Sequence, residues 1–181
     1  MTSLKNICVY CASSSSVDPK YRQLATDLGQ FLGQENRTLV YGGGHVGLMG
    51  ACADAVLEQS AKVIGVIPQY LKDREVAHEG LTVLHVTDTM QERQKKMADL
   101  SDAFVMLPGG LGTLAEFFEI ITWKHLTLHD KPVFVLNAYG YWDQLFAMLA
   151  KAGEEKFLYK DTAELFTVCD SLEDLKKHLL S

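Results

Sequence analysis

Hydrophobic and polar positions alternate along the chain in two different patterns. Short apolar runs bounded by glycine, proline or polar residues predict buried strands, and longer segments with apolar positions three or four residues apart predict helices. The short runs predict strands near residues 6–10, 38–41, 62–67, 82–86, 103–107, 132–136 and 165–168. The longer segments predict helices near residues 19–33, 46–59, 89–100, 113–128, 141–152 and 172–180.

Strands that alternate with helices in this way are typical of α/β proteins. We therefore expect a single Rossmann-like, doubly wound parallel sheet with helices on both faces. No repeat, low-complexity tract or long linker interrupts the alternation, so residues 1–181 are expected to form one domain. Ligands bind such sheets at the carboxyl ends of the strands. Four segments follow predicted strands and should converge on one crevice: 11–16, 42–47, 69–78 and 108–113. Of these, the stretch 69–80 is expected to be irregular.

Composition and charge limit the kinds of partner that the protein is expected to bind. The net charge is −6 and the pI is about 5.5, so no basic surface indicates binding to a nucleic acid polymer. No apolar run approaches the ~18 residues of a membrane span. The four cysteines are scattered, and no apolar signal region precedes the first predicted strand. We therefore expect a cytoplasmic protein with no membrane partner.

The sequence PGGLGTLAE at residues 108–116 joins a predicted strand to a predicted helix. Glycines let the backbone approach a ligand closely, and the first N–H groups of a helix lack partners and carry partial positive charge. Such a turn is therefore a site for phosphate. The residues expected to hold the phosphate are Gly109, Gly110, Leu111, Gly112 and Thr113. Glu116 would then lie one turn into the helix, near whatever the phosphate anchors.

A second glycine-rich turn, GGGHVG at residues 42–47, contains the spacing G-x-G-x-x-G. A dinucleotide site also needs an acidic residue at the end of the next strand, and Ile67-Pro68-Gln69 supplies none. Tight packing of a turn could explain one such loop, but two of them favour a site for a mononucleotide. Gly43, Gly44 and Met49 are further binding candidates here. Ser13 and Ser14 follow the first strand and are candidates too, although turn formation explains them equally well.

Arg93 occupies an unexpected position on its predicted helix. At ~100° per residue it falls on the apolar stripe of Met90, Met97 and Leu100. A guanidinium on a core-facing stripe is costly unless an anion or several acceptors meet it. One interpretation is a structural salt bridge with a buried carboxylate, or a side chain that reaches out to solvent. The other is that Arg93 faces the crevice and contacts the ligand or orients Glu116.

Glu116 and the histidines also have structural interpretations. Thr113 and Glu116 have the spacing of a capping box, in which glutamate accepts a hydrogen bond from the first backbone N–H of the helix. His45 and His78 lie on loops expected at the crevice. His125 and His129 share a helix face but lack the H-E-x-x-H pattern, so no metal site is predicted. The expected chemistry requires no metal and no cofactor.

Three segments resemble one known family: YGGGHVGLMG at 41–50, MQERQKKM at 90–97 and PGGLGTLAE at 108–116. The chain resembles the LONELY GUY family of cytokinin riboside 5′-monophosphate phosphoribohydrolases from Val9 through Tyr141. That resemblance implies an enzyme that cleaves the N-glycosidic bond of N6-substituted adenosine 5′-monophosphates, releasing free base and ribose 5-phosphate. By position, Arg93 and Glu116 match the family's catalytic pair. Its substrate-binding positions fall on Glu75, Gly110, Leu111, Gly112, Thr113, Leu114, Ala115 and Thr122.

Two residues depart from the family pattern. Gln94, also a candidate for binding substrate, stands where the family commonly has lysine, and Ala115 stands where it commonly has a second glutamate. Both changes remove charge near the ligand, so they bear on substrate preference. The resemblance also implies a homodimer with active sites near the interface, and residues 114–128 are apolar almost all round. The alternative function is a non-catalytic carrier of a phosphorylated cofactor such as the molybdenum cofactor, which needs the glycine loops but no arginine–glutamate pair.

Overall fold

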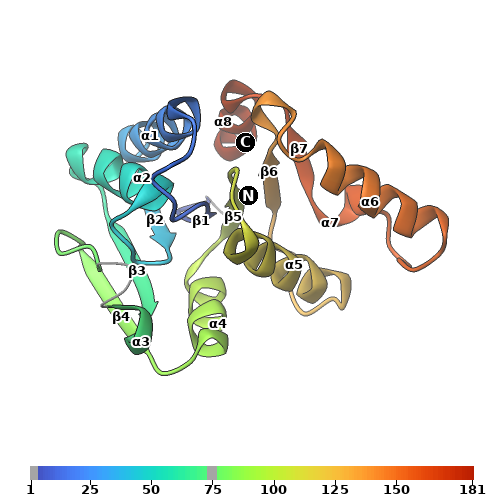
Figure 1. Cartoon of the computed structure of the whole chain (residues 1–181), viewed down its shortest axis with the longest axis horizontal. Coiled ribbons are helices and arrows are strands. Elements are labelled where there is room, and N and C mark those ends of the chain that lie inside the picture. The colour runs from blue at the N-terminus through green and yellow to red at the C-terminus, as the bar shows by residue number, and fades with distance from the viewer. Residues whose placement is uncertain (1–3, 73–76) are drawn as a thin grey trace.

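The computed structural model describes residues 4–72 and 77–181. In this part of the chain a parallel sheet of seven strands runs in the order β4-β3-β2-β1-β5-β6-β7 (Figure 1). The strands are β1 Asn6–Tyr10, β2 Thr38–Tyr41, β3 Val63–Pro68, β4 Val83–Thr87, β5 Ala103–Met106, β6 Val133–Leu136 and β7 Thr167–Cys169. The helices are α1 Pro19–Gln34, α2 Gly47–Glu58, α3 Gln69–Lys72, α4 Met90–Leu100, α5 Leu111–His125, α6 Asp143–Glu154, α7 Thr162–Leu165 and α8 Leu172–Leu180, with a 3-10 turn η1 at Ala138–Gly140.

The α/β fold predicted from the sequence is confirmed, and most element boundaries shift by only one or two residues. Two local predictions are wrong. The last strand begins at Thr167, not at 165, because Asp161 and Glu164 form a capping box that places Leu165 in the short helix α7. The stretch 69–80 is not wholly irregular, because it opens with the helix α3.

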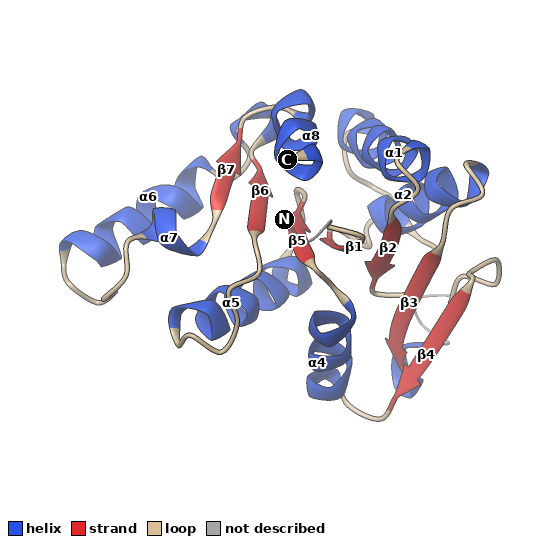
Figure 2. Cartoon of the chain, turned by 180° about the vertical axis from the view of Figure 1, so that it is seen from behind, coloured by secondary structure: helices blue, strands red, loops and turns tan. Residues whose placement is uncertain are grey.

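Helices cover both faces of the sheet, which makes it doubly wound (Figures 1 and 2). Side chains along β1 alternate between two cores. Ile7 and Val9 pack with residues of α1, α2 and α8, whereas Cys8 and Tyr10 pack with residues of α4, α5 and α6. This alternation fixes which residues of each strand can reach the helices on either side.

The order of the strands determines where a ligand can enter. From β1 the chain proceeds outward through β2 and β3 to β4, then returns across the sheet to β5 on the other side of β1. Open α/β sheets bind ligands at such a switch point, outside the carboxyl ends of the strands. Here the loops after β1 and β5 flank it. No helix in the described ranges is long and apolar enough to cross a membrane.

Candidate functional site

A pocket of about 190 Å³ lies at the switch point. Its walls come from the loop after β1, from α2, from α4 and from the start of α5. The described residues that line it are Cys11, Ala12, Ser13, Ser14, Met49, Arg93, Gly110, Leu111, Gly112, Thr113 and Glu116. Two of the four segments predicted to converge, 11–16 and 108–113, meet here, whereas no described residue of 42–47 or 69–78 lines the pocket.

The loop after β5 folds tightly against the helix that follows it. A Cβ atom on Gly109 would collide with the side chain of Thr113, which is itself buried. By contrast, a Cβ on Gly110 or Gly112 would meet no atom from the rest of the described structure within 4 Å. The backbone at the start of α5 is thus packed on one side and open on the other, which suits an anion approaching the first N–H groups of the helix.

The structure excludes the capping interpretation of Glu116. Helix α5 begins at Leu111, two residues earlier than predicted, with Gly110 as its N-cap and no capping side chain. Thr113 is therefore the third helical residue, and Glu116 lies in the second turn, too far along the helix to cap its first N–H. The predicted start at Thr113 was two residues late because Gly112 was assigned to the loop. Glycine is also compatible with the first turn of a helix, where it leaves the backbone N–H accessible.

Arg93 lies in the first turn of α4 and is 6% exposed. The helix starts at Met90 because the Thr89 side chain accepts a hydrogen bond from the backbone N–H of Glu92 (3.1 Å). The guanidinium donates from Nε to the Val66 carbonyl (3.0 Å) and from Nη2 to the Gly42 carbonyl (3.4 Å). Gly42 directly follows β2, and Val66 lies in β3 just beyond its last pair with β2, so the side chain is held beside the carboxyl end of β2.

Arg93 also pairs with Glu116. Nη2 of Arg93 lies 3.4 Å from Oε1 of Glu116, whose side chain is about one-tenth exposed. The buried carboxylate that the structural interpretation of Arg93 requires is thus Glu116 itself, and both groups line the pocket. Two buried charges with fixed partners are costly to assemble, and a pair of this kind that lines a pocket is a candidate functional site.

The glycine-rich loop at residues 42–47 allows Arg93 and the loop after β1 to pack closely against it. A Cβ on Gly42 would collide with Nη2 of Arg93. Gly47, with φ +67°, lies against the backbone of Ser13 and Ser14, where any side chain would clash. The backbone N–H of Leu48, at the start of α2, donates to the Ala12 carbonyl (3.0 Å). This helix start therefore has a protein partner, unlike the open start of α5.

Other predicted binding residues lie away from the pocket. Gly43 accepts a hydrogen bond from the backbone of His78, and Gly44 pairs with Ala77. Glu75 lies outside the described residues. The described residues predicted to bind substrate that do not line the pocket are Gly43, Gly44, Gln94, Gly109, Leu114, Ala115 and Thr122. Gly109 nevertheless adjoins it through Thr113, and Thr122 is exposed on α5.

Cys11 and Ala12 line the pocket although only Ser13 and Ser14 of the segment 11–16 were named as binding candidates. The signal was present, because both follow β1 directly at the switch point. Burial raises the pKa of the Cys11 thiol well above its ordinary value. At neutral pH the thiol stays protonated, which makes it a wall of the pocket and not a nucleophile.

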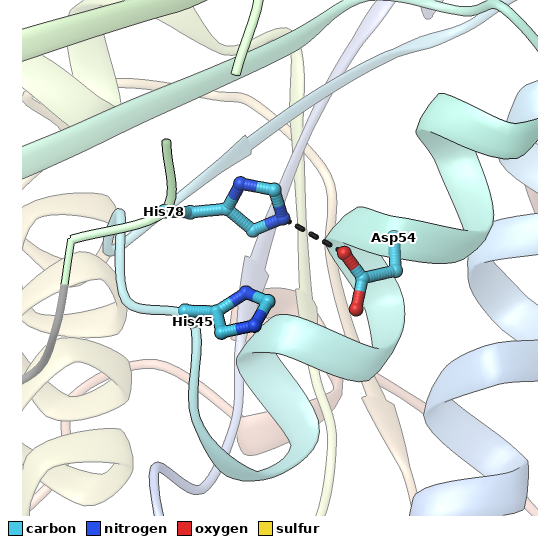
Figure 3. Close-up of side chains that lie close together, drawn as sticks. All are labelled: His45, Asp54 and His78. Carbon is cyan, nitrogen blue, oxygen red and sulfur yellow. Dashed lines mark hydrogen bonds and ion pairs between the residues drawn. The ribbon is translucent and has the colours of Figure 1, made fainter. Parts of the chain in front are cut away.

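His45, Asp54 and His78 form a cluster beside the first glycine loop (Figure 3). The backbone N–H of Gly80 donates to Nδ1 of His78 (3.0 Å), and Nε2 of His78 lies 2.8 Å from Oδ1 of Asp54. Nδ1 is therefore the acceptor, and Nε2 carries the proton and donates it to Asp54. While Nε2 donates its proton to Asp54, it offers no lone pair to a metal ion. We interpret the cluster as a contact that holds residues 77–80 against α2.

Fold and pocket together define a class: a Rossmann-like protein with an open, glycine-rich helix start beside a buried arginine–glutamate pair. A family model described as "Possible lysine decarboxylase" matches residues 49–179. A cytokinin riboside 5′-monophosphate phosphoribohydrolase of Rhodococcoides fascians is 43% identical, over 93% of this chain and 86% of the relative. An enzyme of the same name from Arabidopsis thaliana is 42% identical, over 97% of this chain and 81% of the relative.

The chain belongs to the LONELY GUY family of cytokinin riboside 5′-monophosphate phosphoribohydrolases. Among solved structures, the molybdenum cofactor binding protein of Rippkaea orientalis is similar with a TM-score of 0.73 and 22% identity, over the full length of both chains. At that identity the likeness concerns the fold alone.

Proposed function

We propose that the protein hydrolyses the N-glycosidic bond of nucleoside 5′-monophosphates, with N6-substituted adenosine monophosphates as the substrate class. The relatives named for this reaction support the proposal. The observation that carries it is the buried pair of Arg93 and Glu116 beside the open start of α5. A site that only held a phosphate would have no need of a buried carboxylate, which repels anions.

In the proposed complex the 5′-phosphate binds at the start of α5, where Gly110, Leu111, Gly112 and Thr113 line the pocket. The phosphate lies away from the bond that breaks, so its binding energy positions the ribose without taking part in the chemistry. Glu116 is one turn further along the same helix and faces the same pocket. The ribose would therefore lie next to its carboxylate.

Cleavage transfers the C1′–N9 electron pair to the departing base, which takes up a proton, and builds positive charge on the ribose. The Glu116 carboxylate would stabilise that charge or accept a proton from the water that attacks C1′. Arg93 fixes the carboxylate through the 3.4 Å ion pair and is itself fixed by the carbonyls of Val66 and Gly42. The products are the free base and ribose 5-phosphate.

The 5′-phosphate is expected to decide which substrates are used. We expect kcat/KM for AMP and N6-substituted AMP to exceed that for the matching nucleosides by on the order of 10²-fold or more, because a nucleoside lacks the anchoring group. The purified protein would be incubated with a panel of nucleoside 5′-monophosphates and nucleosides, and the free base measured by chromatography. Equal kcat/KM for adenosine and AMP would contradict a phosphate site at α5.

The alternative, a carrier of a phosphorylated cofactor, rests on fold likeness at 22% identity. A carrier would return the nucleotide unchanged, so the same incubations separate the two functions. Gln94 and Ala115, the departures from the family pattern, lie outside the pocket lining. We infer that they bear on the preference among bases and leave the reaction itself unchanged.

We further propose that two copies of the chain pair through α5. One face of this helix is buried in the core, but an opposite stripe is exposed along its whole length. The stripe consists of Leu111, Ala115, Phe118, Thr122 and, at the C-cap, Leu126, spaced three or four residues apart and apolar except for Thr122. Helices bury such apolar stripes against one another, and pairing would bring Thr122 to an interface next to the pocket.

Free cysteines support a cytoplasmic location.

A charge on this stripe should separate the copies. Phe118→Glu is expected to convert a dimer into a monomer, because a carboxylate cannot be buried in an apolar interface without a partner. Sedimentation velocity at micromolar concentrations measures the change. Met148→Glu, at an exposed apolar position on α6, is the matched control and should remain dimeric. A monomeric wild-type protein, or a dimeric Phe118→Glu variant, would contradict the proposal.

A further inference from the structure

A single tyrosine links the turn after β6 to the glycine-rich loop after β5. The hydroxyl of Tyr141 donates to the carbonyl of Gly109 at 2.7 Å. The two residues belong to neighbouring strand ends but lie 32 positions apart in the sequence. Gly109 directly precedes Gly110, the N-cap of α5 and a residue of the pocket wall.

The ring of Tyr141 is held in place from several sides. It packs edge-on against Trp142 with centroids 4.6 Å apart, and edge-on against Tyr21 of α1 at 5.6 Å. The turn that carries it is also fixed, because the Asn137 side chain accepts from the backbone N–H of Trp142 (2.8 Å). Tyr139 in the same turn has φ +63°, a conformation that is costly for a bulky residue and persists only where the surroundings impose it. The hydroxyl is thus presented to Gly109 in a defined direction.

The hydrogen bond constrains more than one carbonyl. A trans peptide is planar, and its C=O and the following N–H point in opposite directions. Fixing the Gly109 carbonyl towards Tyr141 therefore fixes the Gly110 N–H away from Tyr141. Glycines on both sides of this peptide give it rotational freedom that most sequences lack. Without the Tyr141 hydroxyl, the packing of Gly109 against Thr113 would remain, but the Gly109 carbonyl would lose this hydrogen bond and the direction that it imposes.

We infer that Tyr141 is a positioning residue for the phosphate site: it orients the Gly109–Gly110 peptide and so prepares the start of α5 for the 5′-phosphate. This inference rests on the proposed function. It assigns Tyr141 to the affinity for phosphate, not to the chemical step, because its hydroxyl is bonded to the protein backbone. The residue would act through the loop.

The chain offers a matched control. Tyr159 donates its hydroxyl to the carbonyl of His125, the last residue of α5, also at 2.7 Å. Two tyrosines thus bind the two ends of the same helix through the same type of hydrogen bond. Tyr141→Phe and Tyr159→Phe each remove one hydroxyl and keep the ring, so any purely structural effect should be similar in both.

Kinetics with AMP, and calorimetry with ribose 5-phosphate, test the inference. For Tyr141→Phe we expect KM for AMP and Kd for ribose 5-phosphate to rise about 5- to 10-fold, because ligand binding must then order the Gly109–Gly110 peptide that Tyr141 orders in advance. The value of kcat should change less than about twofold. Tyr159→Phe should leave KM, Kd and kcat at wild-type values. Equal effects in the two variants, or a fall in kcat with KM unchanged, would overturn the inference.

The outcomes also separate this inference from the proposed function. If AMP is cleaved and Tyr141→Phe behaves like wild type, the inference fails and the proposed function stands. If AMP is not cleaved but ribose 5-phosphate binds, and binds more weakly to Tyr141→Phe, the proposed function fails and the positioning role stands. A wild-type protein that neither cleaves AMP nor binds ribose 5-phosphate overturns both.

Discussion

Glu116→Gln is expected to lower kcat by about 10²- to 10⁴-fold, the range typical of a lost acid–base group. Glutamine has nearly the same size as glutamate, so the packing of α5 against the sheet should persist. Nucleotide affinity should be retained or increase, because a negative charge near the phosphate disappears. Turnover, AMP affinity by calorimetry and melting temperature would be measured on the same preparation.

Glu119→Gln is the matched control, because Glu119 lies on the same helix three residues further along and is only half-buried. Burial raises the pKa of this carboxyl, so the residue is not simply a surface charge. It does not line the pocket, however, and its variant should turn over normally. Full activity in Glu116→Gln would remove the carboxylate from the mechanism and would favour the carrier function over the hydrolase.

Arg93→Ala should reduce kcat/KM by roughly 10²-fold or more, because the Glu116 carboxylate loses the group that fixes it. Stability should fall as well. Removing one partner of a buried ion pair costs about 3 to 5 kcal/mol, and the carbonyls of Val66 and Gly42 also lose their donor. Activity must therefore be compared at a temperature where thermal melting shows the variant to be folded.

Arg93→Lys separates charge from geometry. Lysine keeps the positive charge but lacks the planar set of donors with which Arg93 contacts two carbonyls and a carboxylate at once. We expect it to restore stability in part and activity poorly. Lys96→Ala, an exposed charge on the same helix, serves as the control and should be fully active. Near-normal turnover of Arg93→Ala would show that the arginine is structural only.

Features that depend on local pattern were predictable from the sequence. Arg93 stood out because helical periodicity placed a charge on an apolar stripe. The loop at 108–113 stood out because several glycines between a strand and a helix expose the backbone N–H groups that bind anions. Both predictions concern residues close together in the chain, where spacing and backbone chemistry decide the geometry.

Features that depend on contacts between distant segments were not predictable. The carbonyls that hold Arg93 lie 27 and 51 positions away, and periodicity says nothing about which strand ends will meet. The bond from Tyr141 to Gly109 spans 32 positions for the same reason. The start of α5 was misplaced because glycine is compatible with both a loop and a first helical turn. Thr122 lies outside the pocket, and helical periodicity does not show which exposed positions of α5 reach it.

Cleavage of a glycosidic bond by Arg93 and Glu116 is tested most directly in a single turnover. Excess protein would be mixed with AMP or N6-substituted AMP, and free base and ribose 5-phosphate would be quantified for the wild type and for Glu116→Gln. We predict equal amounts of the two products from the wild type, and intact bound nucleotide in Glu116→Gln over the same period. Recovery of intact nucleotide from the wild-type protein, or equal product formation by the variant, would contradict the proposed reaction.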